Sequence, residues 1–163
     1  MYYDVKVTAL IRQTLPDLSS SDMPVELRSL FPPPSAYNET RIVSEGRLTS
    51  VADRATLSFS DGDDRGYEIS FVRPESGLIT LRRYDPGSRN PFTVVLEENV
   101  RHRCIKPGKN GDKLELITVT ERIDNQLMKK GKMFFRFSVE ICGVRAERAE
   151  FNVEITHTDA DEE

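Results

Sequence analysis

The sequence predicts an all-β fold, a single antiparallel up-and-down barrel of about 8–10 strands. Short segments with alternating apolar and polar residues follow one another from residue 38 to residue 156. Turn-forming runs such as Asp85-Pro86-Gly87 and Asn110-Gly111 separate these segments, and no stretch has the pattern of a long helix. Consecutive strands joined by tight turns pair as hairpins. They favour a closed barrel, because closure leaves no exposed sheet edges.

The segment Lys132–Gly143 carries the clearest strand pattern in the chain. A pleated strand turns successive side chains to opposite faces, so residues two apart share a face. The face predicted to be buried consists of Met133, Phe135, Phe137, Val139 and Ile141. Arg136, Ser138 and Glu140 occupy the other face, where Phe134 is an apolar exception. This pattern predicts a strand with one buried side and one solvated side.

The other strands are predicted from the same alternation. The first is Tyr3–Thr14, with Val5, Val7 and Ala9 on one face. Its pattern slips at Leu10-Ile11, which indicates a β-bulge or an end that is buried on both faces. Further strands are predicted at residues 41–51, 55–59, 67–72, 78–84, 92–97, 100–106, 114–123 and 144–156.

Residues 16–37 interrupt the strand series with a loop or short helix near the N-terminus. A loop of this length in a small domain often has a role, and we interpret it as a lid over the barrel mouth. The apolar residues that could pack there are Leu27, Leu30 and Phe31. The barrel domain is predicted over residues 1–158, followed by a solvated acidic tail at 159–163.

Composition limits the function classes. The 163 residues include 23 basic and 27 acidic ones, with a net charge of −4. A nucleic-acid or anionic-membrane binder would show a basic excess, so neither partner is expected. The sequence shows neither a secretion signal nor a membrane-spanning apolar stretch, so a cytoplasmic protein is expected. Cys104 and Cys142 are accordingly expected to be reduced thiols rather than a disulfide.

Several segments resemble one protein family. They are Val43–Gly46, Ile79–Arg83, Leu96–Cys104, Leu114–Ile123, Phe135–Ile141 and Phe151–Ile155. Together they resemble the YwiB-like family of small uncharacterised bacterial proteins, which is grouped with the lipocalin-like (calycin) β-barrels. The resemblance implies a lipocalin-like barrel and no established reaction.

Polar residues on inward faces are the candidate ligand contacts. His102 shares a face with Val100 and Cys104, so it could meet a ligand, or it could be satisfied by a neighbouring carboxylate or backbone group. Arg83 shares a face with Ile79 and Leu81 and needs either a carboxylate partner or an anionic ligand.

Two threonines and two phenylalanines complete the candidate site. Thr118 and Thr120 could offer hydroxyl groups to a cavity or simply act as β-branched filler. Phe135 and Phe137 are expected to form its apolar wall. Asp61–Gly66 is predicted to be a hairpin turn rather than a calcium loop, because it lacks the acidic ligand that ends such a loop. We find no phosphate loop, nucleophile motif or metal-ligand spacing, so neither a cofactor nor an enzyme is expected.

Two functions remain open from the sequence. In the first, the barrel binds a small apolar or amphipathic ligand, with His102 and Arg83 as polar contacts. In the second, the barrel is solid and its outer face binds a protein partner or a second copy of the chain, with Phe134 as an anchor.

Overall fold

The computed structural model describes residues 2–14, 38–72, 77–87, 90–107, 113–141 and 144–158. These residues form a ten-stranded sheet and one short helix. The elements are β1 (Tyr2–Thr14), β2 (Asn38–Val51), β3 (Arg54–Ser60), β4 (Gly66–Val72), β5 (Leu78–Tyr84), β6 (Phe92–Glu97), β7 (Arg101–Pro107), β8 (Lys113–Gln126), α2 (Leu127–Lys130), β9 (Lys132–Ile141) and β10 (Val144–His157).

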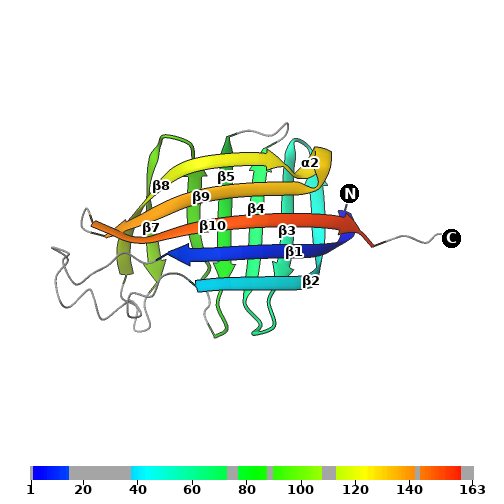
Figure 1. Ribbon diagram of the computed structural model, residues 1–163, viewed down its shortest axis with the longest axis horizontal. Coiled ribbons are helices and arrows are strands. Elements are labelled where there is room, and N and C mark those ends of the chain that lie inside the picture. The colour runs from blue at the N-terminus through cyan, green and yellow to red at the C-terminus, as the bar shows by residue number, and fades with distance from the viewer. Residues whose placement is uncertain are drawn as a thin grey trace.

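The strand order confirms the predicted all-β, up-and-down barrel. The order is β6-β5-β4-β3-β2-β1-β10-β9-β8-β7, and all the ladders are antiparallel. The first strand, β1, pairs with the last strand, β10, in the middle of the strand order. The sheet is therefore interrupted between β6 and β7 rather than between its first and last strands. Figure 1 shows β8, β9, β10, β1 and β2 in the front layer, running across β3, β4 and β5 behind them.

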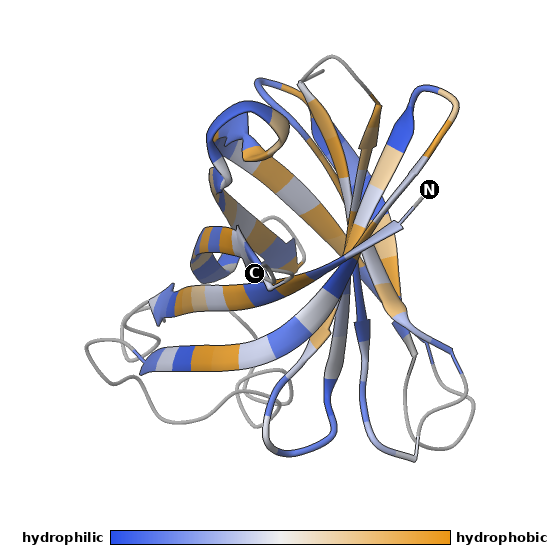
Figure 2. Ribbon diagram, turned by 90° about the vertical axis from the view of Figure 1, so that its right-hand side faces the viewer, coloured by the Kyte–Doolittle hydropathy of each residue, from blue (hydrophilic) through white to orange (hydrophobic). Residues whose placement is uncertain are grey.

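Alternation along the strands places the core inside the barrel. The five residues of β9 that were predicted to share the buried face are at most 7% exposed. Figure 2 shows the same alternation of hydrophobic and hydrophilic residues along several strands. The inner faces of the two layers therefore share one core, and the polar faces lie outside. The prediction that the outer face of β9 is solvated is wrong at Ser138, which is 5% exposed because it is covered where it hydrogen-bonds to Glu121.

Of the two interpretations of Leu10-Ile11 in β1, the bulge is wrong. β1 pairs without a register shift with both β2 and β10, and Ile11 continues the inward face of Val5, Val7 and Ala9. Leu10 is a half-buried residue on the outward face. Two adjacent apolar residues therefore occur here because the outer face of β1 is partly buried, and not because the strand has a bulge.

The register shifts lie elsewhere, in β8 and β10. One falls between Thr120 and Arg122, and the other between Arg145 and Glu147. A bulge inserts one residue and changes which later side chains face inward. The unpredicted helix α2 joins β8 to β9 and ends at Gly131, whose φ of 72° is left-handed. Its amide donates to the Leu127 carbonyl.

The interruption between β6 and β7 is closed by threonine side chains of β8. Thr118 Oγ1 donates to the Val95 carbonyl at 3.2 Å, and the Glu97 amide donates to Thr120 Oγ1 at 3.1 Å. Glu98 also forms an isolated parallel bridge with Thr120. The barrel is thus nearly closed. The prediction that closure leaves no exposed sheet edges is wrong at this junction. We call the junction the seam and define it by Val95, Glu97, Thr118 and Thr120.

Some predictions lie outside the described residues. They are the insertion at 16–37 with its lid role, the tail at 159–163, and the state of Cys142. Cys104 is a free, buried thiol, and burial raises its pKa to about 11. Within the described residues, no helix is long and apolar enough to span a bilayer.

Candidate functional site

Aromatic side chains fill much of the barrel interior. The rings of Phe135 and Phe151 stack with centroids 4.9 Å apart, and Phe137 lies 6.3 Å from each of them. Phe59 and Tyr67 stack at 5.3 Å on the opposite layer, and Tyr67 meets Phe151 edge-on. Within the described part of the barrel, these contacts leave no wide channel along its middle.

A cavity of about 80 Å³ remains beside this aromatic cluster. Gln13 lines it near the end of β1, and Glu147 lines it near the start of β10, so it lies at the end of the barrel opposite the chain termini (Figure 1). Its described apolar lining consists of Ile11, Leu81, Phe92, Val94, Phe137, Val139, Ala149 and Phe151. Its described polar lining consists of Gln13, Thr40, Arg65, Tyr67, Arg83 and Glu147. The cavity therefore has an apolar wall and a polar end.

Arg83, at the end of β5, provides the central charge of this polar end. Its Nη2 donates to Asp85 Oδ2 at 3.3 Å, and its guanidinium lies over the Phe92 ring. Its Nε is buried and lies 3.1 Å from Asp85 Oδ1, but among the described residues no acceptor is aligned with the N–H. An unsatisfied buried donor costs about 1–3 kcal/mol. This position therefore favours a group that brings an acceptor.

Arg65 lies at the exposed rim of the cavity, in the turn before β4. Its Nε lies 2.9 Å from Asp85 Oδ1, so Asp85 is shared between the two arginines. The Arg65 guanidinium also contacts the Tyr67 hydroxyl. Burial raises the pKa of Tyr67, and Arg65 opposes that shift. Tyr67 is therefore a neutral phenol at physiological pH.

Glu147 provides a carboxyl group on the cavity wall. It follows the register shift in β10, and it lies on the inward face two residues before Ala149. Gln13 Nε2 donates to its Oε2 at 3.3 Å. Burial raises the pKa of Glu147, and the charges of Arg83 and Lys106 and the Gln13 hydrogen bond oppose that rise. Burial outweighs these contacts, so the net shift of the Glu147 pKa is upward.

The structure brings together two of the six predicted site residues. Arg83 and Phe137 line the cavity, and Phe135 lies behind its wall in the aromatic stack. His102 lies near the seam, with Nε2 3.2 Å from Glu97 Oε1, which is the carboxylate partner of the alternative interpretation. Thr118 and Thr120 form the seam and do not line the cavity. Their buried hydroxyls are used by the backbone of β6.

Sequence reasoning missed Glu147, Gln13 and Arg65. Phe151 and Val153 lie on the inward face of their strand. Counting back from them in steps of two gives Ala149 and then Glu147, so the alternation predicts that Glu147 also faces inward. The same count from Val5 reaches Gln13. Arg65 lies in a turn, where no periodicity operates, so the sequence offers no comparable signal for it.

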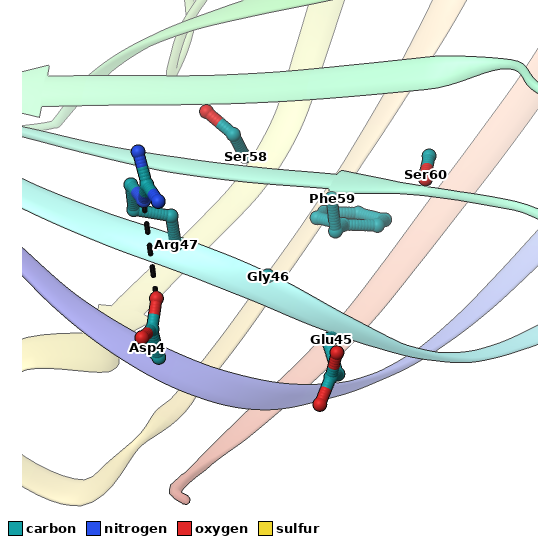
Figure 3. A pocket seen from close by; sticks show the side chains of 7 residues that line it. All are labelled: Asp4, Glu45, Gly46, Arg47, Ser58, Phe59 and Ser60. Atoms are coloured by element: carbon teal, nitrogen blue, oxygen red, sulfur yellow. Dashed lines mark ion pairs between the residues drawn. The ribbon is translucent and has the colours of Figure 1, made fainter.

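A second hollow, of about 480 Å³, lies on the outer surface. Figure 3 shows its lining, with Arg47 and Asp4 joined by an ion pair of 3.9 Å. Glu45, Ser58 and Ser60 complete its polar rim. It is open to solvent, and opposite charges already pair across it. This hollow is larger than the interior cavity, but it encloses nothing, and it is a weaker candidate site.

Gly46 explains why the strands come so close together below this hollow. A Cβ atom at Gly46 would lie 2.6 Å from the Ser58 carbonyl oxygen and 2.7 Å from Val7 Cγ2. Only glycine fits such an approach. The hollow is therefore the outer side of a close approach between the neighbouring strands β1, β2 and β3.

Phe134 lies on the outer face, as predicted, but its ring is half-buried. The guanidinium groups of Arg122 and Arg136 lie 5.6 Å and 5.4 Å from its centroid. These cation–π contacts stabilise the ring within the chain itself. Among the described residues, no group of three or more His, Cys, Asp or Glu side chains gathers as a metal site would require.

Comparison with known proteins places the fold. No protein-family model and no curated protein matches the sequence. A crystal structure of the ywiB protein from Bacillus subtilis is similar, with a TM-score of 0.57 and 11% sequence identity. The match covers 93% of this chain and 92% of that chain. The chain therefore has a YwiB-like fold.

Proposed function

We propose that this protein is a non-enzymatic binding protein that takes a small amphipathic ligand in the cavity at one end of its barrel. The observation that carries the proposal is the buried Arg83 Nε beside an apolar wall, which has no aligned acceptor within the described part of the chain. Buried donors in folded proteins normally have a partner. A ligand with one acceptor group and a short apolar part would supply both kinds of contact.

Cavity size restricts the ligand. A volume of about 80 Å³ is roughly half of a cavity that holds benzene, about 150 Å³. It is also well below the roughly 300–1,000 Å³ of sites for drug-sized molecules. A ligand of a few non-hydrogen atoms is therefore favoured over a fatty acid or a larger apolar molecule.

The broader setting belongs to the same proposal. The sequence resemblance supports membership of the YwiB-like family of bacterial proteins and the lipocalin-like (calycin) group, and composition supports a cytoplasmic location. The alternative function, an interaction module anchored by Phe134, has less support, because Arg122 and Arg136 already flank that ring.

A cavity-filling variant tests the binding function. Ala149 lines the cavity and is 2% exposed, so Ala149→Leu would occupy much of its volume. We expect small alcohols, amides and acids to shift the amide resonances of residues around Leu81 and Gln13 in the wild type, and not in Ala149→Leu. Val153→Leu is the matched control, because it enlarges the same inward face of β10 outside the cavity. Shifts that persist unchanged in Ala149→Leu would exclude the cavity as the binding site.

A further inference from the structure

We propose that the ligand is a short carboxylic acid, bound as its anion against Arg83 while Glu147 takes up one proton. This inference rests on the proposed function and names the class of ligand for the same cavity. No bond is made or broken except the O–H bond that forms when a proton from solvent reaches the Glu147 carboxylate.

The charge of the lining favours an anion. Among the described lining residues, Arg65 and Arg83 are cationic and Glu147 carries the one carboxyl group. Lys106 adds a third positive charge nearby, with Nζ 5.9 Å from the centroid of Phe92. A carboxylate oxygen would accept from Arg83 Nε, whereas an ammonium ligand offers no acceptor.

The position of Glu147 couples ligand binding to the uptake of a proton. Its carboxyl group and the ligand's carboxylate would share one small cavity, and two like charges in such a space disfavour each other. A proton on Glu147 removes that repulsion and supplies a donor to the ligand. Among the described residues, the charged or titratable groups around Glu147 are Arg83 on β5, Lys106 on β7, Arg65 in the turn before β4 and Tyr67 at the start of β4, with Asp85 pairing the two arginines.

The apolar wall favours a hydrocarbon group in the part of the ligand beyond its carboxylate. Phe92 and Val94 of β6 line the cavity together with Phe137 and Val139 of β9, and Phe137 pairs with Ala149 across the β9–β10 ladder. A hydrocarbon tail of one or two carbons would be buried against them, and burial of apolar surface favours binding. Inorganic anions such as phosphate would leave this wall without contacts, so an organic acid fits better.

The test is a titration with propionate, propionamide and n-propylammonium, followed by NMR of the labelled protein from about pH 6 to about pH 8, where propionate stays ionised. We expect propionate to bind best, with an affinity that falls by up to about tenfold for each unit by which the pH is raised. Glu147→Gln should keep propionate binding and flatten that pH dependence. Arg83→Met should weaken binding at least tenfold at every pH.

Matched controls lie on the outer face of the same strands. Arg82→Met removes the neighbouring arginine, which pairs with Glu68, and Glu150→Gln removes a carboxylate paired with Arg136. Neither should change the propionate titration. Thermal denaturation of each variant shows that it is folded before binding is compared.

Each remaining outcome overturns a stated part of the proposal. Propionamide or n-propylammonium bound more tightly than propionate would overturn the acid class and leave the cavity function standing. Propionate binding without pH dependence, or with the same dependence in Glu147→Gln, would overturn the proton uptake. Failure of all three probes, together with failure of the wider set of small molecules, would overturn the binding function itself.

Discussion

Two glutamates of this barrel have opposite environments and opposite pKa shifts. Glu147 faces the cavity, where burial raises its pKa. Glu121 faces outward, where hydrogen bonds from Arg148 and Ser138 lower its pKa against a partial burial effect. Arg148 Nε lies 2.9 Å from Glu121 Oε2, and Ser138 Oγ lies 3.0 Å from it. The same residue type therefore contributes to stability with opposite dependence on pH.

These shifts predict how stability changes with pH. The native state holds its proton on Glu147 more tightly than the unfolded chain, so this residue lowers stability as pH rises above about 4.3. Glu121 stabilises the fold at neutral pH, and its contribution is lost as pH falls through its lowered pKa. We expect Glu147→Gln to raise the melting temperature more at neutral than at acidic pH. Glu121→Gln should lower it at neutral pH and have little effect in acid.

Thermal denaturation of the two variants and the wild type between about pH 3 and about pH 8 provides the measurement. Each variant serves as the control for the other, because both remove one carboxylate from the same barrel. Parallel curves for the two variants would contradict the assignment of opposite environments.

At the scale of elements, the weakest junction of the barrel is the seam between β6 and the β7–β8 hairpin. Other neighbouring strands form ladders of backbone hydrogen bonds, whereas Thr118 and Thr120 bond to β6 through their side chains. Both threonines are at most 2% exposed. The hydroxyl groups thus replace part of a missing ladder.

Replacing either threonine by valine should open this seam. Valine has nearly the same shape, so the change removes hydrogen bonds without creating a large cavity. In Thr120→Val the Glu97 amide loses its acceptor, and we expect a cost of about 1–3 kcal/mol in the free energy of unfolding. Urea denaturation measures the cost, and hydrogen exchange of the Glu97 amide should become faster.

Thr80→Val on the outer face of β5 is the control for this experiment. A surface change of this kind should alter stability by no more than about 0.5 kcal/mol. Unchanged exchange at Glu97 in Thr120→Val would show that the hydroxyl does not hold the seam closed.

At the scale of the whole molecule, the stacked phenylalanines join the two layers of the barrel. Phe135 is fully buried against Phe151, while Phe134, next to it in the chain, lies on the outer face between two arginines. The two rings differ in burial although they are adjacent on β9. They therefore allow a direct comparison of core and surface contributions.

We expect Phe135→Ala to lower the free energy of unfolding by about 3–5 kcal/mol, because it removes a buried ring and leaves a cavity. Phe134→Ala should cost roughly 1 kcal/mol, the value of its cation–π contacts. Urea denaturation of both variants measures the difference. Similar costs at the two positions would mean that the barrel is not closed around the Phe135 stack.

The strands and their inward faces follow from the sequence alone. A period of two is local, and each inward residue of β9 could be read from its neighbours alone. The same period would have reached Gln13 and Glu147, whose side chains interrupt otherwise apolar faces. Local alternation therefore predicts which residues enter the barrel.

What those residues contact inside the barrel depends on how the sheet closes. Arg83 and Glu147 are 64 positions apart in the sequence, and closure of the sheet through β1 and β10 brings them to one cavity. His102, Thr118 and Thr120 point inward by the same rule, but the interruption between β6 and β7 leaves them beside or within the seam. Whether an inward polar group meets a ligand or the backbone depends on where the sheet closes, and closure is a long-range property of all ten strands.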